Sequence, residues 1–281
     1  MADAPVLLTR TSPRLARITF DSAPVNLVTG VLAQRLHEIV VELDADPDLQ
    51  VLVFDSAVPD FFLSHFDLAH LADFPRPDAA TGRQLWTDIA VRLSKAQYIT
   101  VGIIRGRTRG GGNELALALD LRYASREKAF FGQPEVGTAV VPGGGGTERL
   151  PHLIGRDRAL EAVLTSLDYD AATAENWGWV TRALPDAELD GFVDTIVARL
   201  AAFDRTALAT AKRMINRASL PPETDLDTAY ADFLETTTLP GYLARAAAPA
   251  PTGQQALEVE YRLGEFLGIA ALRRQAAGES A

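Results

Sequence analysis

The chain has 281 residues and is 47% hydrophobic, so it can bury a substantial core in one large domain, with room for a small appendage. Its formal net charge of −10 argues against general binding to nucleic acids or anionic membranes. It has no cysteine, which excludes disulfides and thiolate nucleophiles, and its four histidines lack metal-ligand spacing, so no metal site is expected.

The sequence begins without a targeting signal. Residues 1–5 lack the charged segment and apolar core of a secretory signal, and no apolar run is long enough to span a membrane. We therefore expect a cytoplasmic protein with no membrane partner.

Strand-like and helix-like patterns then follow one another along the chain. Alternating or continuous apolar residues predict short strands at 6–8, 15–20, 51–54, 99–104 and 129–131. A helical period predicts helices at 29–44, 84–96, 158–166, 171–177, 189–202, from 207 onward, and at 254–271. Strands separated by helices in this order predict an α/β fold.

The first stretch that predicts chemistry is the glycine cluster 110–112, which runs directly into strong helix formers at 113–119. A glycine-rich helix start leaves backbone N–H groups unpaired at the positive end of the helix dipole. Such groups can bind an anion or a developing oxyanion, and glycine permits close approach. Glu114 falls in the first turn of this helix and is a candidate acid/base residue.

A second acidic residue, Glu135, ends the turn sequence GQPE at 132–135. A second glycine-rich bend, PGGGGT at 142–147, then opens another helix. Each piece alone has an ordinary interpretation, a plain turn or a solvated surface glutamate. Two carboxylates beside two loops with free backbone N–H groups are together the components of an acid/base site with an oxyanion hole.

Three motifs resemble those of the crotonase family, also called the enoyl-CoA hydratase/isomerase superfamily: GGGNELALALD at 110–120, FGQPE at 131–135 and PGGGGTERL at 142–150. The likeness extends over most of residues 10–220. It implies a crotonase-like spiral of ββα turns at 1–200, with the acyl-CoA site, and a C-terminal helical region at 201–281 that serves oligomerisation. It also implies a homo-trimer or hexamer, an acyl-CoA thioester substrate, and no separate cofactor, because coenzyme A is part of the substrate.

The resemblance also assigns roles to residues. The backbone N–H groups of Phe66 and Gly111 would form the oxyanion hole for the thioester carbonyl. Glu114 would help to activate the water that adds at C3, Glu135 would handle the proton at C2, and the Gly143 N–H would be a further water contact.

Residues 64–67 depart from the family pattern, in which small residues precede the aspartate. Ser64, His65 and Phe66 replace them, so these side chains and Asp67 are possible substrate contacts. His65 is a possible extra acid/base, because imidazole titrates near neutral pH, or it packs at the strand-to-helix turn. For Trp86 two interpretations are open: it lines the acyl pocket, or it packs on a helix face.

Arg105, Arg107 and Arg109 enter a region that is small and apolar in the family. Arg109 directly precedes the glycines, where it can hold a substrate carboxylate or a CoA phosphate. We favour the alternative, structural ion pairs with Asp67, Asp120 or other acids, since alternating arginines cannot all point inward.

The C-terminal part is the least like the family. Lys212 is a possible contact for the CoA phosphates, although a lysine on a helix surface is commonly solvated. Beyond residue 221 the family's tail is not recognisable, and a Pro/Ala stretch at 246–251 precedes the last predicted helix.

The two glutamates therefore predict an enoyl-CoA hydratase-like enzyme that adds water across the 2,3 double bond. Within the family, an enoyl-CoA isomerase or a thioester hydrolase is the alternative. From another class, the altered segments are compatible with a non-catalytic homologue that binds acyl-CoA or serves as an assembly subunit.

Overall fold

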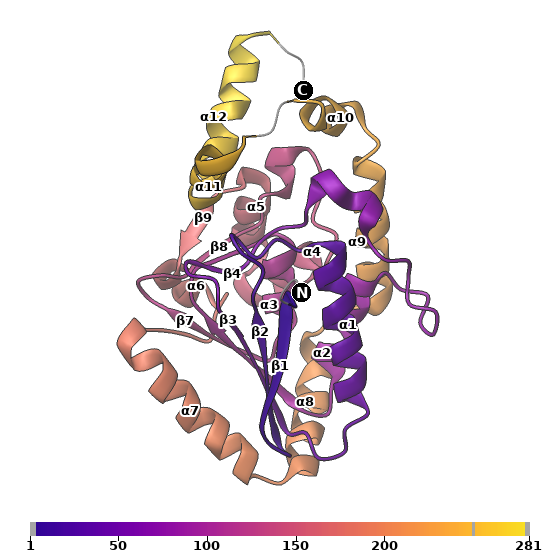
Figure 1. Ribbon diagram of the computed structural model, residues 1–281, viewed down its shortest axis with the longest axis vertical. Coiled ribbons are helices and arrows are strands. Elements are labelled where there is room, and N and C mark those ends of the chain that lie inside the picture. Colours follow the sequence, from indigo (N-terminus) through magenta and orange to yellow (C-terminus); the bar gives the residue numbers. More distant parts are fainter. Residues whose placement is uncertain (1–3, 249–250, 279–281) are drawn as a thin grey trace.

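The computed structural model describes residues 4–248 and 251–278 (Figure 1). Its centre is a six-stranded sheet, with strands in the order β1 (Val6–Ser12), β2 (Leu15–Phe20), β3 (Val51–Ser56), β5 (Ile99–Ile104), β7 (Leu121–Ser125) and β10 (Arg182–Leu184). The hairpin β1–β2 is antiparallel and every other neighbouring pair is parallel. All residues of β5 are buried, as its continuous apolar sequence predicts for a parallel strand covered on both faces.

A smaller sheet lies at the end of the large one. It contains β4 (Phe61–Leu63), β6 (Arg107–Arg109), β8 (Phe130–Gly132) and β9 (Asp168–Asp170), in that order. The strands β4, β6 and β8 follow β3, β5 and β7 in the chain, and each of these pairs leads into a helix. Three successive ββα turns result, so the predicted α/β fold is confirmed.

The helices of the spiral lie close to their predicted positions. They are α1 (Gly30–Asp44), α2 (Leu85–Lys95), α3 (Gly111–Ala118), α4 (Gly146–Ile154), α5 (Arg156–Thr165), α6 (Ala171–Trp177), α7 (Asp186–Ala202) and α8 (Arg205–Ser219), with short 3₁₀ turns η1 (Leu68–Asp73) and η2 (Glu135–Thr138). The starts of α1, α6 and α8 are fixed by side-chain caps, in which Thr29, Asp170 and Asp204 accept a backbone N–H of the first turn.

The core has two parts, one on each face of the large sheet. Helix α7 packs Leu189, Val193 and Val197 against one face. On the other face, α1, α2 and α3 pack with the small sheet in a larger cluster, which includes the fully buried Leu36 and Leu115. Within residues 4–248 and 251–278, no helix has the length and apolar character that crossing a bilayer requires.

The C-terminal region contains more helices than the sequence predicts. Helices α9 (Glu223–Thr236) and α10 (Pro240–Ala246) were not predicted, and the single helix expected at 254–271 is two helices, α11 (Gly253–Tyr261) and α12 (Leu263–Ala276). Part of the Pro/Ala stretch, residues 249–250, lies outside the described residues. The oligomer contacts expected from this region stay a prediction.

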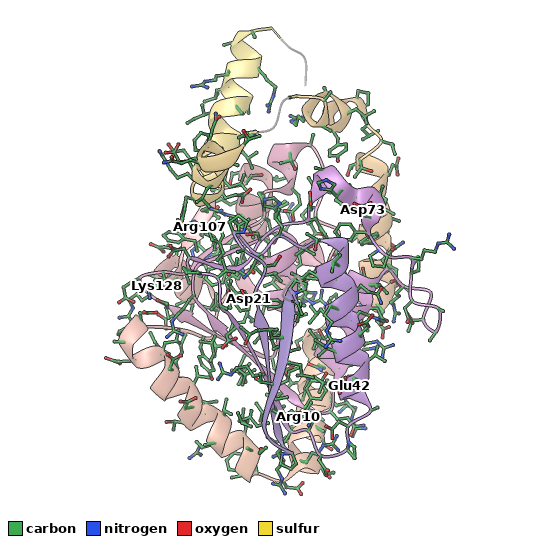
Figure 2. The ribbon with its side chains drawn as sticks, in the orientation of Figure 1. Arg10, Asp21, Glu42, Asp73, Arg107 and Lys128 are labelled. Atoms are coloured by element: carbon green, nitrogen blue, oxygen red, sulfur yellow. The ribbon has the colours of Figure 1, made fainter. Side chains whose placement is uncertain are left out.

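The break between α11 and α12 has a physical cause. Arg107 donates from Nε to the carbonyl oxygen of Tyr261 at 2.9 Å, and Arg109 donates to that of Glu260. In a continuous helix these carbonyl oxygens would accept from backbone N–H groups four residues further along the chain. Because the arginine side chains supply the donors instead, the helix can end here. Figure 2 shows Arg107 beside α11. The helical period of the sequence contains no sign of this long-range contact.

Candidate active site

The backbone N–H of Phe66 has no hydrogen-bond acceptor in the part of the chain that the structure describes. Phe66 lies just after β4, in an isolated parallel bridge with Val28. The next N–H, that of Asp67, donates to the Val28 carbonyl at 3.0 Å. The Val28 N–H donates to the His65 carbonyl at 3.0 Å, and this carbonyl belongs to the same peptide as the Phe66 N–H. Because the C=O and N–H of a trans peptide point in opposite directions, the Phe66 N–H is directed away from Val28 and is free for a ligand.

Gly111 supplies a second free N–H. It is the first residue of α3, so its N–H has no partner within the helix, and no other described residue accepts from it. The N–H of Gly112 donates to the Ser64 carbonyl at 2.9 Å, which ties the start of α3 to the segment that holds Phe66. The two residues predicted for the oxyanion hole are thereby brought together. Their role remains to be tested.

Glycine is required at position 110. Gly110 has φ +49°, a conformation that side chains disfavour, and a Cβ there would lie 2.8 Å from Glu135 Oε1 and 2.9 Å from His65 Cβ. The close approach of Glu135 and His65 to the helix start therefore depends on the absence of a side chain at this position.

Glu114 is fully buried in the first turn of α3. Its Oε1 accepts from the N–H groups of Gly144 at 2.8 Å and Gly146 at 3.0 Å, in the second glycine-rich loop. Its Oε2 has no hydrogen-bond partner among the described residues. Burial raises the pKa of Glu114 to about 7, although the two N–H bonds oppose the rise.

Glu135 lies at the start of η2, almost fully buried. Burial raises its pKa well above the usual range, and the charge of Glu114 raises it further. Among the residues that the structure describes, a single long contact from Gln133 Nε2, at 3.4 Å, reaches its side chain. The two glutamates are therefore close enough to interact, but Glu114 has the stronger hydrogen-bond support for a negative charge.

A chain of side-chain hydrogen bonds fixes the position of Glu135. Trp179 Nε1 donates to Asn113 Oδ1 at 2.9 Å, Asn113 Nδ2 donates to Gln133 Oε1 at 2.5 Å, and Gln133 contacts Glu135. Asn113 belongs to the GGGNE motif and Gln133 to the GQPE motif. The two motifs are thus joined by their own polar side chains, a link that the sequence interpretation missed.

The second glycine-rich loop contacts Glu114 through N–H groups other than that of Gly143. The N–H groups that contact its carboxylate belong to Gly144 and Gly146. Gly143 packs against α9, where a Cβ would lie 2.6 Å from Phe233 Cβ. The water contact predicted for the Gly143 N–H stays a prediction.

Four aromatic rings pack together over the glycine-rich loops. Phe66 has ring centroids 5.2 Å from Phe74, 5.6 Å from Trp86 and 5.9 Å from Phe233. Trp86 is buried and donates from Nε1 to the Gly111 carbonyl at 3.2 Å, so the helix-face interpretation describes it better than an open pocket wall. We call Phe66, Phe74, Trp86 and Phe233 the aromatic cluster.

A cavity of about 320 Å³ lies beside this cluster. Its polar lining includes His65, Glu135 and Glu260, and its apolar lining includes Leu68, Val140 and Val259. Glu114 does not line it. Its Oε2 is on the Trp86 side, because a Cβ on Gly144 would meet both Glu114 Oε2 and Trp86 Cδ1.

Ser64 and Asp67, two of the possible substrate contacts, are engaged with the protein itself. The Ser64 hydroxyl is buried and donates to the Val25 carbonyl at 2.6 Å. Asp67 Oδ2 lies 2.8 Å from His70 Nδ1, although Asp67 also reaches the cavity lining.

Two of the three arginines form ion pairs, as we favoured, with acids other than Asp67 and Asp120, whereas Arg107 donates to the carbonyl oxygens of Tyr261 and Asp60. Arg109 is 1% exposed and donates from Nε and Nη2 to Asp168, both at 2.7 Å. Arg105 pairs with Asp186 and Asp190. The proposed hold of Arg109 on a substrate carboxylate or phosphate is not favoured by this geometry, since its guanidinium is directed at Asp168 and α11.

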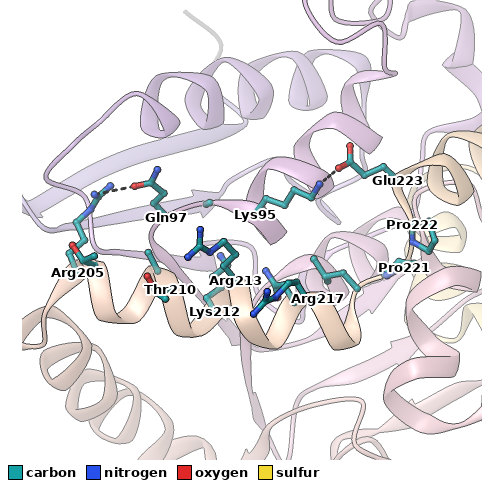
Figure 3. Close-up of a pocket in the computed structure, with 15 residues that line it drawn as sticks. Lys95, Gln97, Arg205, Thr210, Lys212, Arg213, Arg217, Pro221, Pro222 and Glu223 are labelled. Carbon is teal, nitrogen blue, oxygen red and sulfur yellow. Dashed lines mark hydrogen bonds and ion pairs between the residues drawn. The ribbon is translucent and has the colours of Figure 1, made fainter.

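Lys212 also has internal partners. It is buried, lies 2.7 Å from Asp120, and donates to the carbonyls of Leu93 and Tyr98 at 3.0 Å each. It lies at a groove of about 820 Å³ that also includes Lys95 and Arg205 (Figure 3). The groove is lined by residues of α8 and the segments beside it, and neither Glu114 nor Glu135 is among its lining residues.

Sequence reasoning missed the residues that the C-terminal region brings to the site. Phe233 of α9 stacks on Phe66, and Glu260 of α11 contacts His65. The buried position of Phe233 could have been predicted from the sequence, because Leu226, Tyr230 and Phe233 follow a helical period. All three side chains are buried. No sequence pattern pointed to Glu260, since a lone glutamate is usually solvated.

Known proteins resemble the chain in sequence and in structure. The family described as enoyl-CoA hydratase/isomerase matches residues 10–238. The probable enoyl-CoA hydratase echA8 of Mycobacterium bovis is 30% identical over 213 residues, 75% of this chain and 81% of that protein. A short-chain-enoyl-CoA hydratase of Clostridium acetobutylicum is 27% identical over 207 residues, 74% of this chain and 78% of that protein.

The structural likeness reaches further along the chain. The crystal structure of a provisionally assigned enoyl-CoA hydratase from Streptomyces avermitilis has a TM-score of 0.85 and 37% identity, and the match covers 94% of this chain and 96% of that one. It thus includes most of the C-terminal region that the sequence interpretation did not recognise. The predicted spiral of ββα turns is confirmed by this neighbour.

Proposed function

Because the chain belongs to the enoyl-CoA hydratase/isomerase family, we propose that it is an enoyl-CoA hydratase, which adds water across the 2,3 double bond of a 2-enoyl-CoA thioester. One observation carries this proposal. Two buried glutamates with raised pKa values, Glu114 and Glu135, come from the two glycine-rich motifs and lie beside the free N–H groups of Phe66 and Gly111.

The two N–H groups would bind the thioester carbonyl oxygen. When water adds at C3, electrons move from the double bond onto this oxygen, and an enolate-like charge develops there. Donors fixed in place before the reaction stabilise such a charge most in the transition state, because they do not reorganise. Backbone N–H groups suit this role, since their positions are set by β4 and α3 rather than by side-chain rotamers.

The surroundings of the glutamates suit different protonation states. Two backbone N–H groups support a negative charge on Glu114, and its unpaired Oε2 is available to accept a proton from water. Glu135 has no comparable support, so it is the better candidate for the protonated acid that delivers a proton to C2. A raised pKa keeps a carboxylic acid available near neutral pH. The water oxygen would bond to C3 while its proton passes to Glu114, and the proton of Glu135 would pass to C2. Return of one proton from Glu114 to Glu135 would then restore both carboxyls for the next turnover.

A specific observation favours enoyl-CoA isomerisation as a second candidate. Of the two glutamates in the glycine-rich motifs, Glu135 lines the cavity, whereas Glu114 is enclosed on the Trp86 side. A single carboxylate can remove a proton from one carbon of a bound thioester and return it to another, so isomerisation does not need Glu114.

The proposal is tested by adding the protein to crotonyl-CoA or to a longer 2-enoyl-CoA. The absorbance of the conjugated thioester is followed, because hydration of the double bond removes it. Glu114→Gln and Glu135→Gln should each lower kcat by about 10²–10⁴-fold, the usual contribution of a positioned acid or base. Glu175→Gln, an exposed acid on α6, is the matched control and should leave kcat unchanged.

The outcomes separate the candidates. If only Glu135→Gln lowers turnover and a 3-enoyl-CoA is converted to the conjugated 2-enoyl form, the protein is an isomerase and the hydratase proposal fails. If the wild type converts neither substrate but crotonyl-CoA raises its melting temperature, the binding-protein alternative is favoured, since a ligand that binds only the folded state stabilises it.

A further inference from the structure

Three side chains that depart from the family pattern meet at one place. His65, Arg107 and Arg109 all contact residues 260–261, at the end of α11. They come from two different segments of the spiral, the loop that follows β4 and the strand β6. Their common target therefore links two unusual sequence features to one structural element.

His65 uses both of its ring nitrogens. Nδ1 lies 2.9 Å from the Phe66 carbonyl oxygen, and Nε2 lies 3.2 Å and 3.3 Å from the two carboxylate oxygens of Glu260. A carbonyl and a carboxylate both accept, so the two nitrogens donate and the ring is an imidazolium. Burial lowers the pKa of His65, but the hydrogen bond and charge of Glu260 outweigh it and raise the pKa above the usual value.

This arrangement leaves His65 no free nitrogen for acid/base chemistry. It does give His65 a hold on residue 66, because the carbonyl that it binds belongs to the same residue whose N–H is unpaired among the described residues. The Asp67 N–H bond to Val28 constrains the following peptide from one side. His65 constrains it from the other, and Glu260 fixes the imidazole ring.

The docking of α11 combines these polar contacts with the packing of the partly buried Leu257 and Tyr261 against Val25, Val58 and Phe61. No residue of α11 is fully buried, and in α12 only Leu263 and Gly264 are. Gly264 is pressed against the chain before β9, where a Cβ would lie 2.8 Å from the Ser166 carbonyl oxygen. An element with few buried apolar side chains opens at a lower free energy than the core.

We propose that His65 and Glu260 form a positioning pair, which holds the Phe66 backbone in the orientation needed by the oxyanion hole while α11 is docked over the cavity. Val259 and Leu263 line the same cavity, so docking of α11 both closes the site and completes its geometry. The kinetic part of this inference rests on the proposed function, but the docking part does not.

Two single variants and their combination test the pair in the full-length protein. Glu260→Gln and His65→Asn should each lower kcat for 2-enoyl-CoA hydration by about tenfold to a hundredfold, the range expected when a catalytic donor is misplaced by a fraction of an ångström. KM should change much less than kcat. The double variant should be no slower than the slower single variant, because both changes break one connection.

Glu258→Gln is the matched control. It removes the same charge from the same helix, but Glu258 is exposed, so its kcat and melting temperature should equal those of the wild type. Wild-type kcat in both single variants, or rate losses that multiply in the double variant, would overturn the proposal.

Two further measurements do not need turnover. Hydrogen exchange of the α11 amides, residues 253–261, should be at least tenfold faster in Glu260→Gln than in Glu258→Gln. The carbonyl stretch of bound butyryl-CoA should shift toward its value in water in Glu260→Gln, since a displaced oxyanion hole polarises the thioester less. If the wild type hydrates no enoyl-CoA but both of these changes occur, the proposed function fails and the positioning pair stands; if neither occurs, the pair is refuted.

Discussion

The cavity has two walls that differ in how they are held. The wall from the spiral carries Glu135, and behind it Glu114 and Gly111, all fixed by backbone hydrogen bonds or by buried side-chain networks. The wall from the C-terminal helices carries Val259 and Glu260 of α11, which has no fully buried residue.

The difference separates two tasks. Groups that react must keep their positions to a fraction of an ångström, and this is achieved where the backbone itself supplies the contacts. A wall that admits and encloses a substrate must be able to move, and such elements come from the less stable part of a structure. A substitution in the first wall should therefore change the chemistry, and one in the second should change docking.

Gly110→Ala should have the largest effect on the spiral wall. The added methyl would meet Glu135 Oε1 and His65 Cβ, at a backbone conformation that alanine disfavours. We expect kcat to fall by about a thousandfold, comparable to the loss of a general acid. Gly191→Ala on α7 is the control, because a Cβ there meets nothing within 4 Å. Near-wild-type kcat in Gly110→Ala would show that the spiral wall is not rigid.

Arg109→Ala tests the connection between the walls. Arg109 is buried and joins Asp168 to the Glu260 carbonyl, so its removal leaves a partly buried carboxylate without its partner. The free energy of unfolding should fall by about 3 kcal/mol, as is typical when one member of a buried pair is removed. Urea denaturation measures this. Arg156→Ala, whose pair with Asp157 is highly exposed, should change stability by less than about 0.5 kcal/mol. Equal losses of stability in Arg109→Ala and Arg156→Ala would show that the buried link from Asp168 through Arg109 to Glu260 is not important for stability.

The pH dependence of stability gives the smallest effect. A carboxyl whose pKa is higher in the folded state favours folding below its unfolded pKa, and this advantage is lost as pH rises toward the folded pKa. For Glu114 the relevant window runs from 4.5 to about 7, and the loss amounts to about 3 kcal/mol at most. Glu114→Gln should remove this component, so its melting temperature should fall less between pH 5 and pH 8 than that of the wild type. Parallel curves would show that Glu114 does not titrate in this window.

The same two walls explain which features could be predicted from sequence. Helix starts, strands and the Glu114 and Glu135 motifs depend on residues close together in the chain, so turn and periodicity rules identify them. The positions of Phe233 and Glu260 depend on packing between segments more than 150 residues apart, as in the contact of Glu260 with His65. No local pattern specifies which polar group a distant glutamate will meet.

The arginines illustrate the limits of local rules. Residues two apart on a strand lie on the same side, and Arg107 and Arg109 of β6 both donate to main-chain oxygens at the end of α11. The expectation that alternation would separate the arginines therefore does not hold for this pair. The acidic partners of Arg105 and Arg109 could not be chosen from the sequence, because the chain contains 37 aspartates and glutamates.

Arg107 and Arg109 recognise α11 through main-chain oxygens, and a main-chain oxygen is the same whichever residue bears it. Side-chain substitutions at position 261 would leave the Arg107 hydrogen bond available. A one-residue deletion within α11 would instead rotate every following carbonyl by about 100° around the helix axis. The main-chain contacts of α11 thus tolerate a change of side chain at position 261 but not a change of length before residue 262, and spacers or tags are best placed beyond α12.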